Sequence, residues 1–184
     1  MNPTLQTILS RQTVREFTAD PVPPEALDAV LQAALRAPSA RNKQPVHLRV
    51  ITDKALLDEM NVDFKNLVGW DTPAYTLWDK HPVYHNAPAF LFLVSENGAA
   101  MDAGLMAENI ALAAASLGLG SCMVGSLGAL FRDEACRAKW NAILEIPREW
   151  HFDLGIALGV PAETPPMKER EDGHVKFIQK KETL

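Results

Sequence analysis

Hydrophobic and polar positions along this chain follow two periods, which divide it into helices and strands. Apolar residues at helical spacing, or in long alanine-rich runs, predict helices from Pro3 up to Arg11 and over residues 25–37, 54–60, 101–117 and 132–140. Runs that are apolar throughout, or that alternate in twos, predict strands over residues 46–52, 89–94, 120–126 and 150–160. Helices and strands therefore follow one another along most of the chain.

Two of these elements carry a further prediction. The 101–117 helix is apolar nearly all round, which is typical of a helix buried centrally or at a subunit interface. In the 150–160 strand, alternation predicts one face of large residues and an opposite face of small ones. The expected large face is Trp150, Phe152, Leu154, Ile156, Leu158 and Val160. A last short strand-like piece is expected around Val175, Phe177 and Ile178.

Residues 61–84 have no clean period. Aromatic residues are scattered through the segment, and Pro73 and Pro82 interrupt it. The aromatic residues are Phe64, Trp70, Tyr75, Trp78 and Tyr84. A long irregular aromatic segment either covers a binding pocket or forms a surface flap packed on its own side chains, and the sequence leaves both open.

Composition excludes several classes of protein. A chain of 184 residues fits one domain with a sizeable core, and the formal net charge of −5 argues against a general nucleic-acid binder. The two cysteines, Cys122 and Cys136, form no Cys-x-x-Cys pair and suit a reducing cytosol, so a cytoplasmic protein is expected. No apolar run is long enough to cross a bilayer, and the first residues lack a signal-peptide pattern.

Cations alternate in the stretch that follows the first helix. Arg11, Thr13 and Arg15 occupy every second position, so an extended backbone presents them to the same side. Guanidinium groups pair bidentately with phosphate oxygens, and a hydroxyl adds a hydrogen bond. The segment is thus either a phosphate site or an ordinary solvated charged turn. Lys168 and Arg170 repeat the same spacing in a proline-rich arm that begins at Pro161.

No set of side chains suggests chemistry by the protein alone. Gly118-Leu119-Gly120 follows a helix and precedes a strand, the reverse of a dinucleotide-binding turn. His81 and His85 lack a third ligand nearby, so no metal site is expected. Cys122 lies in an apolar strand, where cysteine usually serves packing. An anion site without a catalytic constellation is typical of a protein whose cofactor carries the reaction.

Five segments, taken in order, resemble the FMN-dependent nitroreductase family. The segments are RQTVREF (11–17), APSARNKQP (37–45), NAP (86–88) before an apolar strand, LGLGSC (117–122) after an alanine-rich helix, and ALGVP (157–161) followed by Lys168 and Arg170. The similarity extends from residue 8 to about residue 170.

The resemblance implies an α+β fold: a mixed five-stranded sheet flanked by helices, in an intertwined homodimer. It also implies that residues 1–184 form one nitroreductase-like domain, with an arm from about residue 161 that reaches the partner subunit. Two FMN molecules would lie at the dimer interface.

Three groups of residues would hold FMN in this interpretation. The phosphate and ribityl chain would be held by Arg11, Gln12, Thr13 and Arg15, with Lys168 and Arg170 closing on the phosphate. Pro38, Ser39, Ala40 and Asn42 would approach the isoalloxazine from the partner subunit. Val124 and Gly125 would supply backbone near the flavin N5 atom. The chain departs from the family at Gln12, where a second arginine is usual, at Thr13, where serine is usual, and at Val46, where tryptophan is common.

The implied function is an FMN-dependent oxidoreductase. It would pass hydride from NADH or NADPH to a nitroaromatic, quinone or similar small aromatic acceptor by a ping-pong mechanism, with no catalytic side chain of its own. Two alternatives remain open. One is a specialised flavin enzyme of the same fold, for reductive dehalogenation or flavin breakdown, and the other is a non-catalytic flavin-binding protein.

Overall fold

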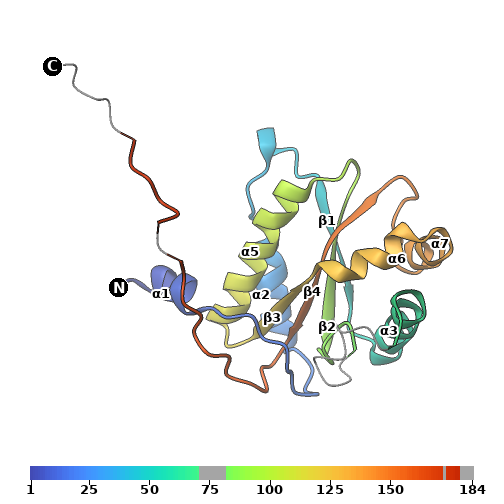
Figure 1. Cartoon of the computed structure of the whole chain (residues 1–184), viewed down its shortest axis with the longest axis horizontal. Coiled ribbons are helices and arrows are strands. Elements are labelled where there is room, and N and C mark those ends of the chain that lie inside the picture. Colours follow the sequence, from blue (N-terminus) through green and yellow to red (C-terminus); the bar gives the residue numbers. More distant parts are fainter. Residues whose placement is uncertain (71–81, 172, 179–184) are drawn as a thin grey trace.

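The computed structural model describes residues 1–70, 82–171 and 173–178 (Figure 1). Its helices are α1 (Pro3–Ser10), α2 (Pro24–Leu35), α3 (Lys54–Val68), α5 (Ala100–Ser116), α6 (Gly128–Arg132) and α7 (Glu134–Ile143), with short 3-10 turns at Ala40–Asn42 and Gly125–Leu127. Its strands are β1 (Val46–Ile51), β2 (Ala89–Ser95), β3 (Gly120–Val124) and β4 (His151–Gly159). Within the described residues, no helix is both long and apolar enough to cross a membrane.

The strands form a single sheet in the order β1-β2-β4-β3, with every neighbouring pair antiparallel. The expected sheet was mixed and five-stranded; among the described residues it has four strands and is antiparallel throughout. The reason lies in the position of β4. β2 and β3 run parallel and are joined through α5, but β4 lies between them and pairs antiparallel with both.

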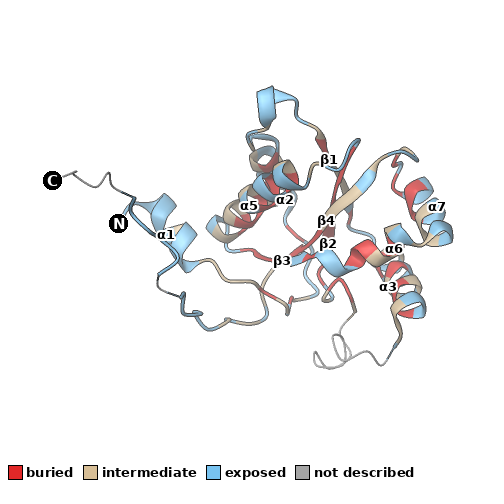
Figure 2. Ribbon diagram, turned by 45° about the horizontal axis from the view of Figure 1, so that its top comes forward, coloured by how far each residue is buried: buried red, intermediate tan, exposed pale blue. Residues whose placement is uncertain are grey.

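Helices cover both faces of the sheet (Figure 2). α2 and α5 pack on one face, and α3, α6 and α7 pack on the other. β2 is buried along its whole length because it faces both layers. Ala89, Leu91 and Leu93 belong to the α2–α5 side, whereas Phe90 and Phe92 belong to the α3–α7 side. The continuous apolar run of this strand was therefore a correct signal of burial on two faces.

The predicted large face of β4 is wrong at its first residues. Leu93 pairs with Leu154, but the next residue, Val94, pairs with Phe152, so Asp153 is an extra residue in a β-bulge. The bulge reverses the alternation. Phe152 therefore packs on the α3–α7 side, where its ring stacks on Phe131 with centroids 4.6 Å apart. Leu154 lies on the α2–α5 side.

Several helix boundaries also differ from expectation. α3 runs to Val68 rather than residue 60, because Phe64 continues the buried face of Leu57 and Met60. The expected 132–140 helix is two helices, since Asp133 is extended and caps the second through Cys136 N–H at 2.9 Å. Residues 173–178 contain no strand, contrary to prediction.

Residues 61–84, which have no clean period in the sequence, begin inside a helix. The first of them belong to α3, and Phe64 is a core residue. Trp70 is half exposed and donates a hydrogen bond to Asn66 Oδ1 at 3.1 Å. Tyr75 and Trp78 lie outside the described residues.

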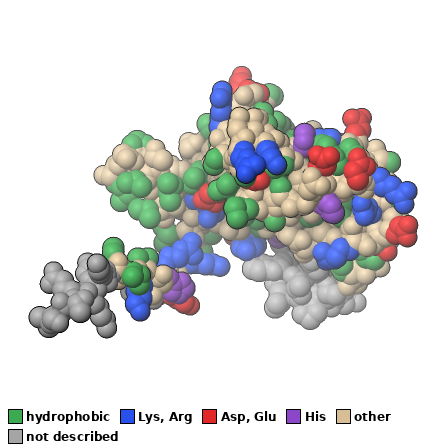
Figure 3. All heavy atoms as spheres, turned by 90° about the horizontal axis from the view of Figure 1, so that it is seen from above, with side chains coloured by type: hydrophobic (Ala, Val, Ile, Leu, Met, Phe, Trp, Pro, Cys, Tyr) green, Lys and Arg blue, Asp and Glu red, His purple; other side chains and the backbone are tan. Residues whose placement is uncertain are grey.

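The first helix projects from the body with no buried residue. Asn2 caps it, because its side chain accepts the Leu5 N–H at 2.9 Å. Leu5, Ile8 and Leu9 are spaced to share one face of this helix, and that face is open to solvent. Figure 3 shows this part as a knob of hydrophobic and uncharged side chains beside the body.

Candidate functional site

The segment 11–17, which we call the cationic segment, lies along the free edge of β3. It begins at Arg11, which ends α1 with its N–H on Thr7 O, a position where a helix favours a cation. Val14 N–H donates to Ser121 O at 3.0 Å, which ties the segment to the edge strand. Val14 is buried, while Thr13 and Arg15 on either side are partly exposed. The buried Val14 fits an extended backbone here, and the placement of Arg11, Thr13 and Arg15 on one side stays a prediction.

Gly120 makes this close approach possible. A Cβ at Gly120 would lie 2.7 Å from Val14 Cβ, which is closer than two non-bonded carbon atoms come in proteins. The glycine at the start of β3 thus sets how closely the cationic segment lies on the sheet. Sequence alone gave this residue no such role, because the contact joins positions far apart in the chain.

The arm, residues 161–178, runs antiparallel to the cationic segment at its start. Phe17 and Pro161 form a β-bridge, and Ala162 N–H donates to Glu16 O at 2.8 Å. Gln12 Nε2 then contacts Met167 Sδ at 2.9 Å. The arm therefore lies beside the cationic segment as far as Met167, and Lys168 is the next residue in the chain.

Arg11 has unused binding capacity. Its side chain is 20% exposed, and its Nε is buried with no hydrogen-bond partner in the described part of the chain. The nearest carboxylate oxygen, Glu108 Oε1, lies 3.9 Å away, too far for a hydrogen bond. An unsatisfied buried donor costs about 1–3 kcal/mol. An anion that accepted this N–H would remove that cost, so Arg11 fits a phosphate.

The loop 38–45 is strained and polar. Arg41, Asn42 and Gln44 all have φ near +50°, which is uncommon for residues other than glycine. The Ser39 hydroxyl oxygen holds the turn by accepting the backbone N–H of Gln44 at 2.9 Å. The side-chain oxygen Oδ1 of Asn42 accepts a hydrogen bond from the side-chain Nε2 of Gln44 at 3.2 Å. Such strain is typical of functional loops.

This loop and the cationic segment occupy different ends of one subunit. The loop packs by Asp102 and Met106, at the start of α5, around a cavity of about 170 Å³. α1, which leads into the segment, packs by Asn109, Leu112 and Ser116, near the other end of α5. The structure therefore does not bring Pro38, Ser39, Ala40 and Asn42 together with Arg11 within a single chain.

Val124 and Gly125 lie where β3 ends in the 3-10 turn. Two residues earlier on the strand, Cys122 is buried, and burial raises the pKa of its thiol. A thiol with a raised pKa is a poor nucleophile, which agrees with a packing role. Among the described residues, no group of three or more His, Cys, Asp and Glu side chains is arranged to hold a metal ion.

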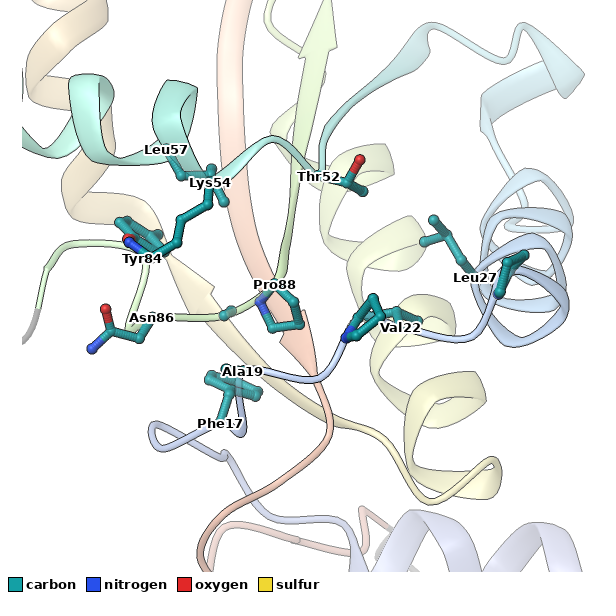
Figure 4. A pocket seen from close by; sticks show the side chains of 13 residues that line it. Phe17, Ala19, Val22, Leu27, Thr52, Lys54, Leu57, Tyr84, Asn86 and Pro88 are labelled. Atoms are coloured by element: carbon teal, nitrogen blue, oxygen red, sulfur yellow. The ribbon is translucent and has the colours of Figure 1, made fainter.

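A separate cavity of about 540 Å³ opens behind Phe17, between the starts of α2 and α3 (Figure 4). Its walls are mostly apolar, with Thr52, Lys54 and Asn86 as polar groups. Tyr84 lines it and donates its hydroxyl to Asp58, which also accepts Lys54 Nζ at 2.6 Å. Burial, followed by the Asp58 hydrogen bond, raises the pKa of Tyr84 to about 12. Of the irregular segment, only its last residue, Tyr84, lines this cavity among the described residues, so neither interpretation of residues 61–84 is decided.

The family follows from comparison with known proteins. A model of the nitroreductase family matches residues 8–160. The chain belongs to the nitroreductase family. This confirms the family indicated by the five segments, and the match spans the cationic segment, the loop 38–45 and the whole sheet.

Individual nitroreductase relatives agree over most of the chain. The NADPH-flavin oxidoreductase of Vibrio harveyi is 31% identical over 180 residues, which cover 95% of this chain and 72% of that protein. A crystal structure of a nitroreductase with bound FMN from Desulfitobacterium hafniense DCB-2 has a TM-score of 0.89 at 27% identity, and covers 97% of this chain and 100% of that chain.

A third relative was solved with a nicotinamide cofactor. It is the NADPH:FMN oxidoreductase from Vibrio harveyi complexed with NAD+. Its TM-score is 0.73 at 28% identity, and the alignment covers 100% of this chain and 80% of that chain. Of the two solved structures, one therefore contains FMN and the other NAD+.

Proposed function

We propose that this chain is an FMN-dependent oxidoreductase that passes hydride from NADH or NADPH to a nitroaromatic, quinone or similar acceptor. Family membership and the flavin named for its relatives support the reaction class. The observation that carries the proposal is the Arg11 guanidinium. It is largely buried, has an Nε without an acceptor among the described residues, and stands in a row with Thr13 and Arg15.

The residues at this site fit a flavin phosphate. Arg11 and Arg15 would bind phosphate oxygens, Thr13 would donate its hydroxyl and Gln12 would border the ribityl chain. Lys168 and Arg170, carried by the arm, would close on the phosphate. Charge-assisted hydrogen bonds of this kind are roughly twice as strong as neutral ones. Val124 and Gly125 would present backbone groups at the far end of β3.

The loop 38–45 completes the site only from a second subunit. Pro38, Ser39, Ala40 and Asn42 lie away from the cationic segment in one chain but would reach it in a homodimer. In this arrangement, the chain's residues orient the cofactor and restrict access to it. When bound, FMN supplies the two-electron chemistry, and no side chain of the protein is required as acid, base or nucleophile.

The kinetic order follows from a single accessible site. Because donor and acceptor would use the same open face in turn, the oxidised nicotinamide must leave before the acceptor binds. Initial rates with both substrates varied should therefore give parallel double-reciprocal lines. Intersecting lines, with evidence for a ternary complex, would point to separate donor and acceptor sites.

The deciding experiment is an absorption spectrum of the purified protein, followed by anaerobic titration with NADH and with NADPH. We expect bound flavin that one of the two nicotinamides bleaches. A protein that shows no flavin and fails to bind added FMN would contradict the proposal. Bound flavin without steady-state NAD(P)H oxidation would favour the non-catalytic flavin-binding alternative.

A further inference from the structure

One carboxylate joins the arm to the cationic segment. Glu163 Oε1 accepts the backbone N–H of Arg15, and it also accepts the N–H of Glu16 at 3.2 Å. These two N–H groups are not paired in the sheet, so the carboxylate supplies the hydrogen-bond acceptor that a neighbouring strand would otherwise supply. Glu163 is only partly exposed, and hydrogen bonds to a charged acceptor are the stronger kind.

A carboxylate beside a phosphate site requires an explanation, since two anions repel each other. The geometry provides one, because Glu163 uses its charge on backbone N–H groups of the cationic segment. The flanking contacts continue the same pairing: Ala162 N–H on Glu16 O precedes it, and Gln12 on Met167 follows it. The carboxylate thus lies in the middle of a row of contacts that aligns the two segments.

Gln12 gives this row a further meaning. The nitroreductase pattern usually has a second arginine at this position, and here the amide contacts Met167 instead. Lys168 is the next residue in the arm. The contact between Gln12 and Met167 therefore brings the backbone of Lys168 near position 12, where the usual arginine is absent. The residue that lacks the usual positive charge is thus the same residue that contacts the arm.

We propose that Glu163 is a positioning residue that fastens the arm along the cationic segment, so that Lys168 supplies the charge missing at Gln12. The proposal rests on the proposed function, because Lys168 acts on the FMN phosphate. Glu163 binds the cationic segment through the backbone N–H groups of Arg15 and Glu16. Its effect on FMN reaches the site through the arm.

The first test measures FMN binding by flavin fluorescence in three full-length variants. E163A removes the acceptor and should weaken FMN binding roughly tenfold or more. E163Q keeps a carbonyl oxygen for the same N–H groups but loses the charge, so it should bind FMN more tightly than E163A does. E169A removes an equal charge from the exposed part of the arm, and it should bind as wild type does. FMN binding by E163A at wild-type strength would overturn the proposal.

The second test is a double-mutant cycle with K168A. If Glu163 acts through Lys168, the loss caused by K168A should be several-fold in the wild-type protein and nearly absent in the E163A background. A merely structural role would leave the two losses additive. Additive losses would therefore overturn the link between Glu163 and Lys168.

The third test does not depend on flavin. Trypsin cleaves after Lys168 and Arg170, and a docked arm slows that cleavage. In flavin-free protein, E163A should be cut several times faster than wild type. E163Q should be cut more slowly than E163A, and E169A should match wild type. If no form binds FMN, the proposed function fails while this result still reports on arm docking. Equal cleavage of E163A and wild type would contradict the role of Glu163 in fastening the arm to the cationic segment.

Discussion

At the scale of single residues, the site is built on alternation and on one unsatisfied donor. Thr13 and Arg15 flank the buried Val14, as the period of an extended segment predicts. Arg11 Nε is buried and has no hydrogen-bond partner among the described residues, so an anion at this row would gain a hydrogen bond. The native ion pair with Glu108 Oε1 is long, at 3.9 Å, so an anion that competes for Arg11 displaces only a weak contact. Charge alone would not distinguish such a site from a solvated turn.

Replacement of Arg11 by alanine should weaken FMN binding by roughly 1.5–3 kcal/mol, the scale of a hydrogen bond to a charged group. Titration of flavin fluorescence at constant ionic strength measures the change. Arg148 is a suitable control, because it is an exposed cation on the turn before β4. Equal affinities for R11A and R148A would contradict the assigned phosphate site.

At the scale of elements, the edge of β3 and the bulge in β4 decide where functional residues lie. The cationic segment is held to the sheet by the Val14–Ser121 hydrogen bond and by the space that Gly120 leaves. The Asp153 bulge lies at the other end of the sheet, opposite the end of β2 and beside Ser95, whose hydroxyl caps the approach to α5 by accepting Ala99 N–H at 2.8 Å.

Replacement of Gly120 by alanine should displace the cationic segment, because the new Cβ would overlap Val14. Overpacking of this kind costs about 1–3 kcal/mol. We expect a lower melting temperature and weaker FMN binding together. Gly104 is the control, since a Cβ there meets nothing within 4 Å. If G120A binds FMN as G104A does, the segment does not depend on this contact.

Asp153, the extra residue in the bulge, should make the stability of the fold depend on pH. Burial raises the pKa of this carboxyl above its ordinary 3.8, against smaller opposing effects of Ser95 and His151, and Oδ2 has no hydrogen-bond partner among the described residues. A raised folded pKa means that folding favours the protonated form. Stability is then complete below about pH 3.8 and is lost as the pH rises through the folded value.

D153N should therefore raise the melting temperature at pH 7, and its advantage should shrink as the pH falls towards about 4. Asp133 provides a control of opposite sign, because its hydrogen bond from the Cys136 N–H lowers its pKa. D133N should lower the melting temperature at pH 7 and lose that effect in acid. An advantage of D153N that is constant with pH would rule out ionisation as its cause.

At the scale of the whole molecule, a single chain exposes large apolar side chains on several of its elements. α1 exposes Leu5, Ile8 and Leu9, and α5 exposes Met101 and Leu105. The end of the arm exposes Val175, Phe177 and Ile178. Large apolar side chains exposed on several elements are what an interface between subunits would cover.

We therefore expect an obligate homodimer with a large apolar interface, measurable by sedimentation at micromolar concentration. L9E should weaken the dimer and, with it, FMN binding, because the loop 38–45 would no longer reach a partner's site. V62E is the control, since Val62 is an exposed apolar residue on α3, on the opposite face of the sheet. A stable monomer that retains FMN would contradict this expectation.

The sequence by itself determined the local elements and the chemistry of the cationic segment. Helices and strands were predicted because burial imposes a period of 3.6 or 2 on neighbouring residues, and that signal is carried within each segment. The family resemblance supplied the candidate flavin residues, from Arg11 to Arg170, and the family is confirmed. The contribution of each residue to FMN binding stays a prediction.

Only the tertiary structure decided how these parts meet. The strand order that makes the sheet antiparallel, the bulge that turns Phe152 to the other face, and the row of contacts from Phe17–Pro161 to Gln12–Met167 all join residues far apart in sequence. Glu163 gave no signal of its role, because a single carboxylate has no period and its partners are backbone N–H groups. Long-range pairing depends on which surfaces pack together, and local periodicity does not contain that information.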